Sequence, residues 1–151
     1  MDRPAAIDHM SPDVRLVDAA ELDLQQVLAL YGAVGWTIYT SSPETVSTAL
    51  SGSAAIAVAR AGTELVGLAR VISDGASICY LQDVLVHPDF QRRGIGRRLV
   101  ESVLQPFSHV RQKVLLTDDE AGQKAFYESL GYRHVTDNDG GALRAFARFD
   151  A

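Results

Sequence analysis

The stretch VLVHPDFQRRGIGRRLV, from Val84 to Val100, passes from an apolar strand through a glycine-spaced turn into a helix. Gly94 and Gly96 stand one residue apart, and a pair of arginines lies on each side of them. The N-terminus of a helix leaves about four backbone N–H groups without a helical partner and carries roughly half a positive charge, so anions bind there. Glycines let an anion approach the bare backbone. The stretch therefore predicts a site for a small anion such as phosphate, the alternative being a solvated basic turn.

Two common phosphate-binding loops do not fit this turn. The dinucleotide-binding fingerprint has a third glycine three residues after the second, where this chain has Leu99. The P-loop requires Gly-Lys followed by Ser or Thr, which this sequence does not contain. A phosphate bound here would be held by another type of loop.

The apolar periodicity predicts an α/β domain whose mostly antiparallel, mixed sheet has about seven strands, with helices on both faces. The expected strands are residues 14–19, 54–61, 64–73, 77–86, 113–119, 132–137 and 142–149. The expected helices are residues 21–34, 42–50, 95–107 and 120–130, with Gly131 as the stop of the last one. Residues 138–141 are expected to form a hairpin turn. Residues 1–10 are predicted to be a flexible leader, and residues 11–151 a single domain.

The composition is that of a globular protein, with 47% apolar and 22% charged residues among 151. A net charge of −5 disfavours nucleic acid as a partner. No apolar run approaches the ~20 residues of a membrane span, so no membrane partner is expected. The single cysteine, Cys79, predicts a reducing compartment, the cytoplasm, and is expected in the core rather than as a nucleophile.

Two segments of the chain resemble the motifs of the GNAT superfamily of acyl-CoA N-acyltransferases. Motif A of that family reads Gln/Arg-x-x-Gly-x-Gly/Ala, and Gln91, Gly94 and Gly96 stand at its fixed positions. The segment AFYESLGY resembles motif B, with the matching residues Ala125, Tyr127, Gly131 and Tyr132. The order of the expected elements is also that of the family. The sequence departs from it at TDDEAG, residues 117–122, where an asparagine is common before the motif B helix.

The resemblance implies acetyl-CoA as the acyl donor and no metal ion. In this family the strand before the turn splays from its neighbour, its exposed backbone pairs with the pantetheine arm, and the N–H groups of the turn hold the pyrophosphate. The residues implied in binding acetyl-CoA are Val84, Leu85, Val86, Gln91, Arg92, Arg93, Gly94, Ile95, Gly96 and Arg97.

Acetyl transfer by direct attack requires a neutral amine, a stabilised thioester oxygen and a proton for the leaving thiolate. By its position in motif B, Tyr127 is implied as the proton donor. Asp83 is the candidate base because it is a carboxylate in an apolar strand, and a structural, hydrogen-bonded aspartate is the equal alternative. Tyr80 and Gln82, on the opposite face of the strand, are candidates to hold a water that relays the proton.

The acceptor side is predicted from aromatic residues. The region between the first two helices forms the acceptor wall in this family, and it contains Trp36 and Tyr39 here, which are equally expected as core residues. The implied function is acetylation of a primary amine on a small molecule. Acetylation of a protein or peptide amine, and a binding module that holds acyl-CoA without turnover, are the alternatives. Dimers are common in the family, so a homodimer is also expected.

Overall fold

A five-stranded sheet lies at the centre of the first of two compact units, residues 1–115 and 116–151, into which the chain divides. This computed structural model describes residues 11–137 and 143–150, so the expected leader at 1–10 and the hairpin turn at 138–141 lie outside the described residues. The strands are β1 (Asp13–Val17), β2 (Ala55–Ala61), β3 (Glu64–Ser73), β4 (Ile78–Val86) and β5 (Gln112–Leu115). The α-helices are α1 (Leu24–Ala33), α2 (Thr37–Thr40), α3 (Pro43–Ser51), α4 (Ile95–Leu104) and α5 (Ala121–Ser129).

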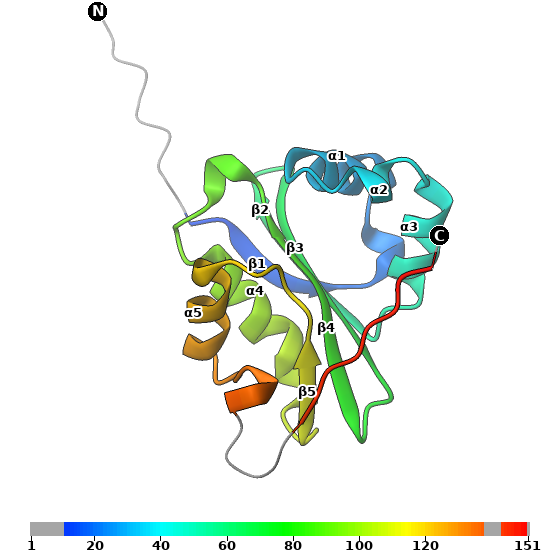
Figure 1. Cartoon of the computed structure of the whole chain (residues 1–151). Coiled ribbons are helices and arrows are strands. Elements are labelled where there is room, and N and C mark those ends of the chain that lie inside the picture. The colour runs from blue at the N-terminus through cyan, green and yellow to red at the C-terminus, as the bar shows by residue number, and fades with distance from the viewer. Residues whose placement is uncertain (1–10, 138–142, 151) are drawn as a thin grey trace, which may run out of the picture. The chain divides into compact units, whose positions relative to one another are not determined.

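The sheet follows the order of the chain, β1-β2-β3-β4-β5. The first four strands run antiparallel to their neighbours, whereas β5 joins β4 in parallel. A parallel pair needs a crossover connection, and α4 supplies it between β4 and β5. The expectation of a mostly antiparallel, mixed sheet is thus confirmed, and Figure 1 shows the strands between α1–α3 on one side and α4 on the other.

The two faces of the sheet bury different helices because side chains alternate along each strand. On β2, Ile56 and Val58 belong to the apolar core formed with α1 and α3. On β3, Gly67 lies beneath α4, where an added Cβ atom would stand 2.9 Å from Leu99 Cδ1. The missing side chain at Gly67 therefore lets α4 lie directly on the strand.

The prediction of about seven strands is wrong for the described residues, which contain five. Residues 132–137 form a short 3₁₀ turn at Val135–Asp137 instead of a strand, and residues 143–150 are irregular. Leu143, Phe146 and Phe149 are exposed there. They recur every third residue, so an extended strand would place them on both of its faces rather than on one apolar face.

The second unit contains α5, which ends as expected at Gly131. Gly131 has φ +92°, and its N–H bonds to Glu128 C=O while the N–H of Tyr132 bonds to Tyr127 C=O. This pair of bonds is the Schellman arrangement, which needs a left-handed residue after the helix. Glycine adopts that conformation without steric cost.

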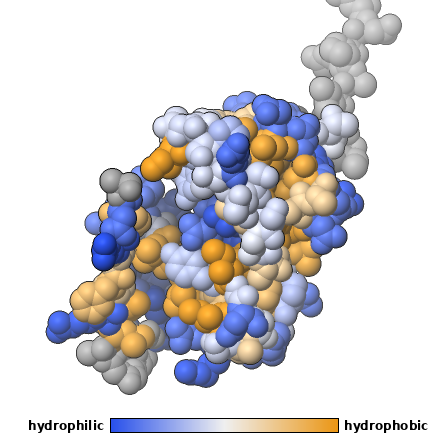
Figure 2. All heavy atoms as spheres, turned by 90° about the vertical axis from the view of Figure 1, so that its right-hand side faces the viewer, coloured by the Kyte–Doolittle hydropathy of each residue, from blue (hydrophilic) through white to orange (hydrophobic). Residues whose placement is uncertain are grey.

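No helix within residues 11–137 or 143–150 is long and apolar enough to cross a membrane. Figure 2 shows one face of the molecule, on which hydrophobic and hydrophilic side chains intermingle. Such dispersed apolar exposure is ordinary for a protein surface.

Candidate active site

Strand β4 has an edge that β5 covers only in part. Its pairing with β5 spans Ile78–Leu81, whereas its pairing with β3 continues to Val86. The backbone of Gln82–Val86 on the side away from β3 has no strand partner among the described residues, and we call it the open edge of β4. The strand pairing of β4 and β5 ends at Leu81 and Leu115, and the divergence of the two strands that the resemblance implies stays a prediction.

The alternation of backbone hydrogen bonds along β4 decides which residues turn their N–H and C=O groups toward the open edge. The N–H of His87 donates to Val66 C=O at 2.8 Å, on the β3 side. Backbone groups alternate along a strand, so those of Leu85 also face β3, while those of Val84 and Val86 face the open edge. Leu85 moreover buries its side chain in the core. Of the three strand residues implied in binding acetyl-CoA, two thus direct their backbone groups toward this edge.

Gln91 ties the turn to the open edge. Its Nε2 donates to Val86 C=O at 3.0 Å, which leaves the N–H of Val86 and both backbone groups of Val84 along the edge. The resemblance implies Gln91 as a residue that binds acetyl-CoA, which stays a prediction, and in the structure its side chain links the strand to the turn.

The turn itself contains two left-handed residues. Gly94 caps α4 with φ +78°, and Arg92 has φ +63°, the only positive φ of a non-glycine residue in the described chain. Strained backbone of this kind costs about 1–3 kcal/mol and clusters at functional sites. The helical ladder begins where Arg98 N–H meets Gly94 C=O at 3.2 Å, so the N–H groups of Ile95 and Gly96 point out of the helix end.

Three of the four arginines contact other side chains or backbone groups within the described part of the chain. Arg93 lies over the Phe90 ring at 5.2 Å, and Arg97 pairs with Glu101 at 3.3 Å. Arg98 donates to Ser11 Oγ at 2.7 Å and to Pro12 C=O at 2.8 Å, which fastens α4 to the start of β1. Because the Ile95 side chain is buried, only its backbone remains for a ligand. These arginine side chains are thus engaged within the protein, while the backbone N–H groups of Ile95 and Gly96 have no partner within the helix.

Asp83 is a buried ion-pair partner. Its Oδ2 accepts hydrogen bonds from Arg70 Nε at 2.5 Å and from the Tyr31 hydroxyl at 2.6 Å, and its exposed fraction is 2%. The Arg70 guanidinium also reaches Ser53 Oγ at 3.4 Å. These contacts support the alternative of a structural, hydrogen-bonded aspartate over that of a base open to substrate.

Burial and the contacts with Asp83 change the pKa values of Tyr31 and Arg70. Burial, followed by the charge and the hydrogen bond of Asp83, raises the pKa of Tyr31 far above its usual range. Burial lowers the pKa of Arg70, but the charge and the hydrogen bond of Asp83 outweigh this, so the net change is upward. Both groups therefore keep their protons at neutral pH, and both donate to Asp83.

The register of β3 and β4 slips within this network. Arg70 pairs with Asp83 but the next residue, Val71, pairs with Leu81, so Gln82 is the extra residue of a β-bulge. Gln82 and Tyr80 are half-buried. Cys79 is fully buried, as expected of a core residue, and burial raises the pKa of its thiol.

The predicted acceptor residues form an aromatic cluster with Tyr31. The ring centroids of Trp36 and Tyr39 lie 5.9 and 5.2 Å from that of Tyr31 and 6.2 Å from each other. Tyr31 is buried, whereas Trp36 and Tyr39 are half-buried against the core. Both aromatics thus belong to the edge of the core and still present part of their surface.

The second unit holds Tyr127 and a pocket. Tyr127 lies on α5 in edge-to-face contact with Phe126 and Tyr132, at 4.9 and 6.0 Å between ring centroids. Burial raises its pKa, so the phenol keeps its proton at neutral pH. A proton held in this way is a requirement for an acid catalyst.

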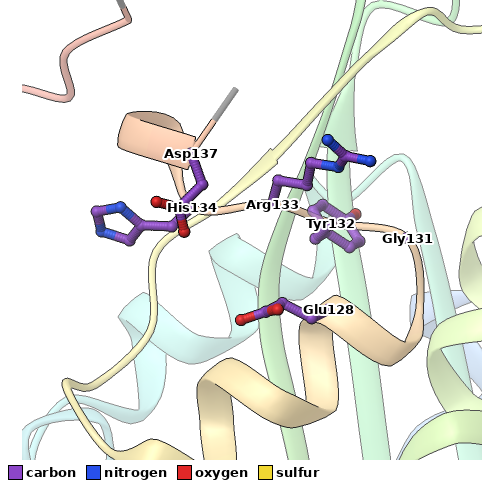
Figure 3. A pocket seen from close by; sticks show the side chains of 6 residues that line it. All are labelled: Glu128, Gly131, Tyr132, Arg133, His134 and Asp137. Carbon is purple, nitrogen blue, oxygen red and sulfur yellow. The ribbon is translucent and has the colours of Figure 1, made fainter. Parts of the chain in front are cut away.

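A pocket of about 470 Å³ lies between the end of α5 and the segment that follows it. Its lining residues are Glu128, Gly131, Tyr132, Arg133, His134 and Asp137. In Figure 3, His134 and Asp137 stand at one end of the pocket and Tyr132 and Arg133 at the other. Lys124 contacts Asp137 at 3.4 Å and Glu128 at 3.8 Å, so both carboxylates are partly neutralised. The sequence did not single out this pocket. Among the described residues no group of three or more His, Cys, Asp or Glu side chains is arranged to hold a metal ion.

The chain is similar in sequence to one protein family and to curated relatives. The family described as "Acetyltransferase (GNAT) domain" matches residues 24–141. The "Uncharacterized N-acetyltransferase ycf52" of Pyropia yezoensis is 29% identical over 132 residues, which are 85% of this chain and 74% of that protein.

Solved structures agree with these relatives. A GNAT-family acetyltransferase from Streptococcus pneumoniae TIGR4 superposes with a TM-score of 0.74 at 32% identity, covering 91% of this chain and 98% of the other. The aminoglycoside N-acetyltransferase AAC(6')-Iy, solved in complex with CoA, shares the fold with a TM-score of 0.69 at 16% identity, covering 95% of this chain and 98% of the other.

Proposed function

Since this chain belongs to the GNAT acetyltransferase family and is an acyltransferase, we propose that it moves the acetyl group of acetyl-CoA to a primary amine of a small molecule. Membership confirms the GNAT-like fold and the enzyme class expected from the two motifs. The observation that carries the proposal is the open edge of β4, which leads through the Gln91–Gly94 turn into the N-terminus of α4.

Acetyl-CoA binds in two parts in this proposal. The pantetheine arm adds to the open edge as a strand would, through the backbone of Val84 and the N–H of Val86. The pyrophosphate lies against the backbone N–H groups of residues 92–97, where the helix end favours negative charge. A relative in structure, AAC(6')-Iy, was solved with CoA, which supports CoA as the ligand.

The reaction is a direct attack within a ternary complex. The neutral amine nitrogen attacks the thioester carbon, the C–S bond breaks, and the amine loses a proton while the thiolate gains one. A backbone N–H of the open edge stabilises the developing negative charge on the thioester oxygen. Tyr127 donates the proton to the leaving thiolate. Water held near Tyr80 and Gln82 accepts the proton of the amine, because Asp83 is buried and its Oδ2 already accepts hydrogen bonds from Arg70 and Tyr31.

The acceptor is a small amine that rests on Trp36 and Tyr39. Their half-buried rings supply apolar surface and a face for a cation. An amine on a protein or peptide is the second candidate, and a long open groove beside these rings would favour it. We place the enzyme in the cytoplasm, in keeping with its single buried thiol, and retain a homodimer as the expected assembly.

Thermal unfolding with and without acetyl-CoA tests the proposal. At 100 times its dissociation constant a ligand adds about 2.7 kcal/mol, which raises the midpoint by roughly 5–11 °C for this size. Gly96→Val should abolish the shift, while Arg98→Ala, which removes contacts to Ser11 and Pro12, should lower the midpoint and keep the shift. No shift at millimolar acetyl-CoA would contradict the proposal. Thiol release with a panel of amines and lysine peptides then separates the two acceptor classes, and absence of turnover despite binding would favour a non-catalytic module.

A further inference from the structure

We propose that Tyr31 is a positioning residue for the acceptor: its buried hydroxyl holds the aromatic wall of Trp36 and Tyr39 at a set distance from the open edge of β4. The inference rests on the proposed function, because it assigns α1 and α2 to the acceptor side of that site.

One end of the connection is the Asp83 carboxylate. Its Oδ2 receives the Tyr31 hydroxyl from α1 and Arg70 Nε from β3, so three elements meet at one oxygen atom. Asp83 stands between the bulge residue Gln82 and Val84, whose backbone serves the open edge. Because the Asp83 side chain is held by both α1 and β3, rotation of β4 at the bulge is limited.

The other end is the aromatic wall. The backbone C=O of Tyr31 accepts the N–H of Trp36 at 3.0 Å, and the Tyr31 ring touches the rings of both Trp36 and Tyr39. Tyr31 therefore contacts the wall with its backbone and ring, and the reacting strand with its hydroxyl. The same residue joins both sides of the proposed acceptor site.

Stability alone does not require this hydroxyl. A phenylalanine fills nearly the same volume, and buried ionic groups are often no more stabilising than apolar side chains of similar size. The hydroxyl fixes the orientation of the Tyr31 side chain, because its hydrogen bond to Asp83 is short and Arg70 holds the Asp83 carboxylate in place. The bond thus sets where the wall lies, rather than only whether the core is filled.

The first test needs no substrate. Trp36 is the only tryptophan of the chain, so quenching of intrinsic fluorescence by acrylamide reports the wall directly. In Tyr31→Phe we expect the Trp36 emission to shift to the red and the quenching constant to rise, with the acetyl-CoA thermal shift preserved. Val103→Ala is the matched control, because it empties a fully buried site on α4 without touching the network, and its quenching should equal that of the wild type.

Kinetics give the second test. With the amine of highest turnover in the panel, Tyr31→Phe should lower kcat/KM for the amine by roughly tenfold, chiefly through a higher KM. This is less than the roughly 100-fold loss of rate that a misplacement of about 1 Å can cause, because the ring remains. The KM for acetyl-CoA should not change. Ser53→Ala, which removes an acceptor of Arg70, should move quenching in the same direction by less.

Unchanged quenching in Tyr31→Phe would overturn the positioning role, and so would an equal rise in Val103→Ala. Equal rises in both KM values would also overturn it. These failures are distinct from failure of the proposed function, which would appear as a wild-type protein that acetyl-CoA does not stabilise.

Discussion

Replacing Gly67 by alanine tests how closely α4 lies on the sheet. The new Cβ atom would stand 2.9 Å from Leu99 Cδ1, 3.1 Å from Ala59 Cβ and 3.4 Å from the Leu85 carbonyl oxygen. At the first distance the end of the Leu99 side chain must shift, and because Leu99 is fully buried its movement presses on the packing of α4. Overpacking of this kind costs about 1–3 kcal/mol. At about 2–4 °C per kcal/mol for a chain of this length, the midpoint should fall by roughly 2–12 °C.

Thermal unfolding of Gly67→Ala beside Gly122→Ala measures this effect. Gly122 has no heavy atom within 4 Å of the Cβ position and lies in α5, so the same change there should be neutral or stabilise by at most about 1 kcal/mol. The acetyl-CoA shift should also shrink in Gly67→Ala, because a displaced α4 carries its N-terminus away from the strand. A Gly67→Ala protein that melts with the wild type would refute the close approach of α4.

The glycine turn, the buried Tyr31 hydroxyl and Tyr127 can each be tested by substitution. Gly94→Val should lose the acetyl-CoA thermal shift, whereas Gly94→Asn should keep it. The backbone at Gly94, with φ +78°, suits asparagine but costs about 1–2 kcal/mol or more for a branched residue. Equal thermal shifts in the two variants would show that the left-handed cap does not shape the ligand site. The raised pKa of Tyr31 means that its contribution to stability is complete below the pKa of an unfolded tyrosine, about 10, and is lost as pH rises above it. The urea midpoint of the wild type should therefore fall relative to that of Tyr31→Phe from about pH 9 to about pH 11, whichever variant is the more stable at neutral pH, and a constant difference would contradict this linkage. Tyr127→Phe should lower kcat by roughly 100-fold or more with acetyl-CoA binding unchanged, as measured by thiol release, and an unaltered kcat would remove Tyr127 from the proton transfer.

Much of the fold was predictable because its signals are local. The switch from an apolar strand to a glycine-spaced helix start appears within the residues 84–100, and the Gly131 stop follows from a single left-handed position. The apolar segments 54–73 and 77–86 predicted the three central strands to within a few residues. The short helix Thr37–Thr40 was not expected, because four residues give no helical period to recognise.

The last two expected strands show where pattern reasoning failed. Residues 142–149 are apolar at most positions, and alanine, which is poorly suited to strands, makes up three of them. Apolar content alone is therefore a poor strand signal for this segment. The spacing of Leu143, Phe146 and Phe149 does not fit the two-residue period of a strand.

At the candidate site, the missing information was the partner of Asp83. A lone arginine in the apolar segment 64–73 was a visible signal for one, since a charge in a buried strand requires compensation. Tyr31, which lies 52 residues away in the sequence, bonds to the same carboxylate. This contact follows only from the packing of α1 on the sheet. The phase of β4, which separates Val84 and Val86 from Leu85, likewise depends on pairing with β3.

The open edge of β4 has a consequence for the protein without its ligand. Within residues 11–137 and 143–150 no strand pairs with this edge, and an unpaired row of backbone donors and acceptors is a template on which another extended chain can assemble, including a second molecule of the same kind. The ligand that fits this edge would then act as a blocker of self-association as well as a reactant. A concentrated ligand-free solution should aggregate sooner than one saturated with CoA, and light scattering over time would record the difference.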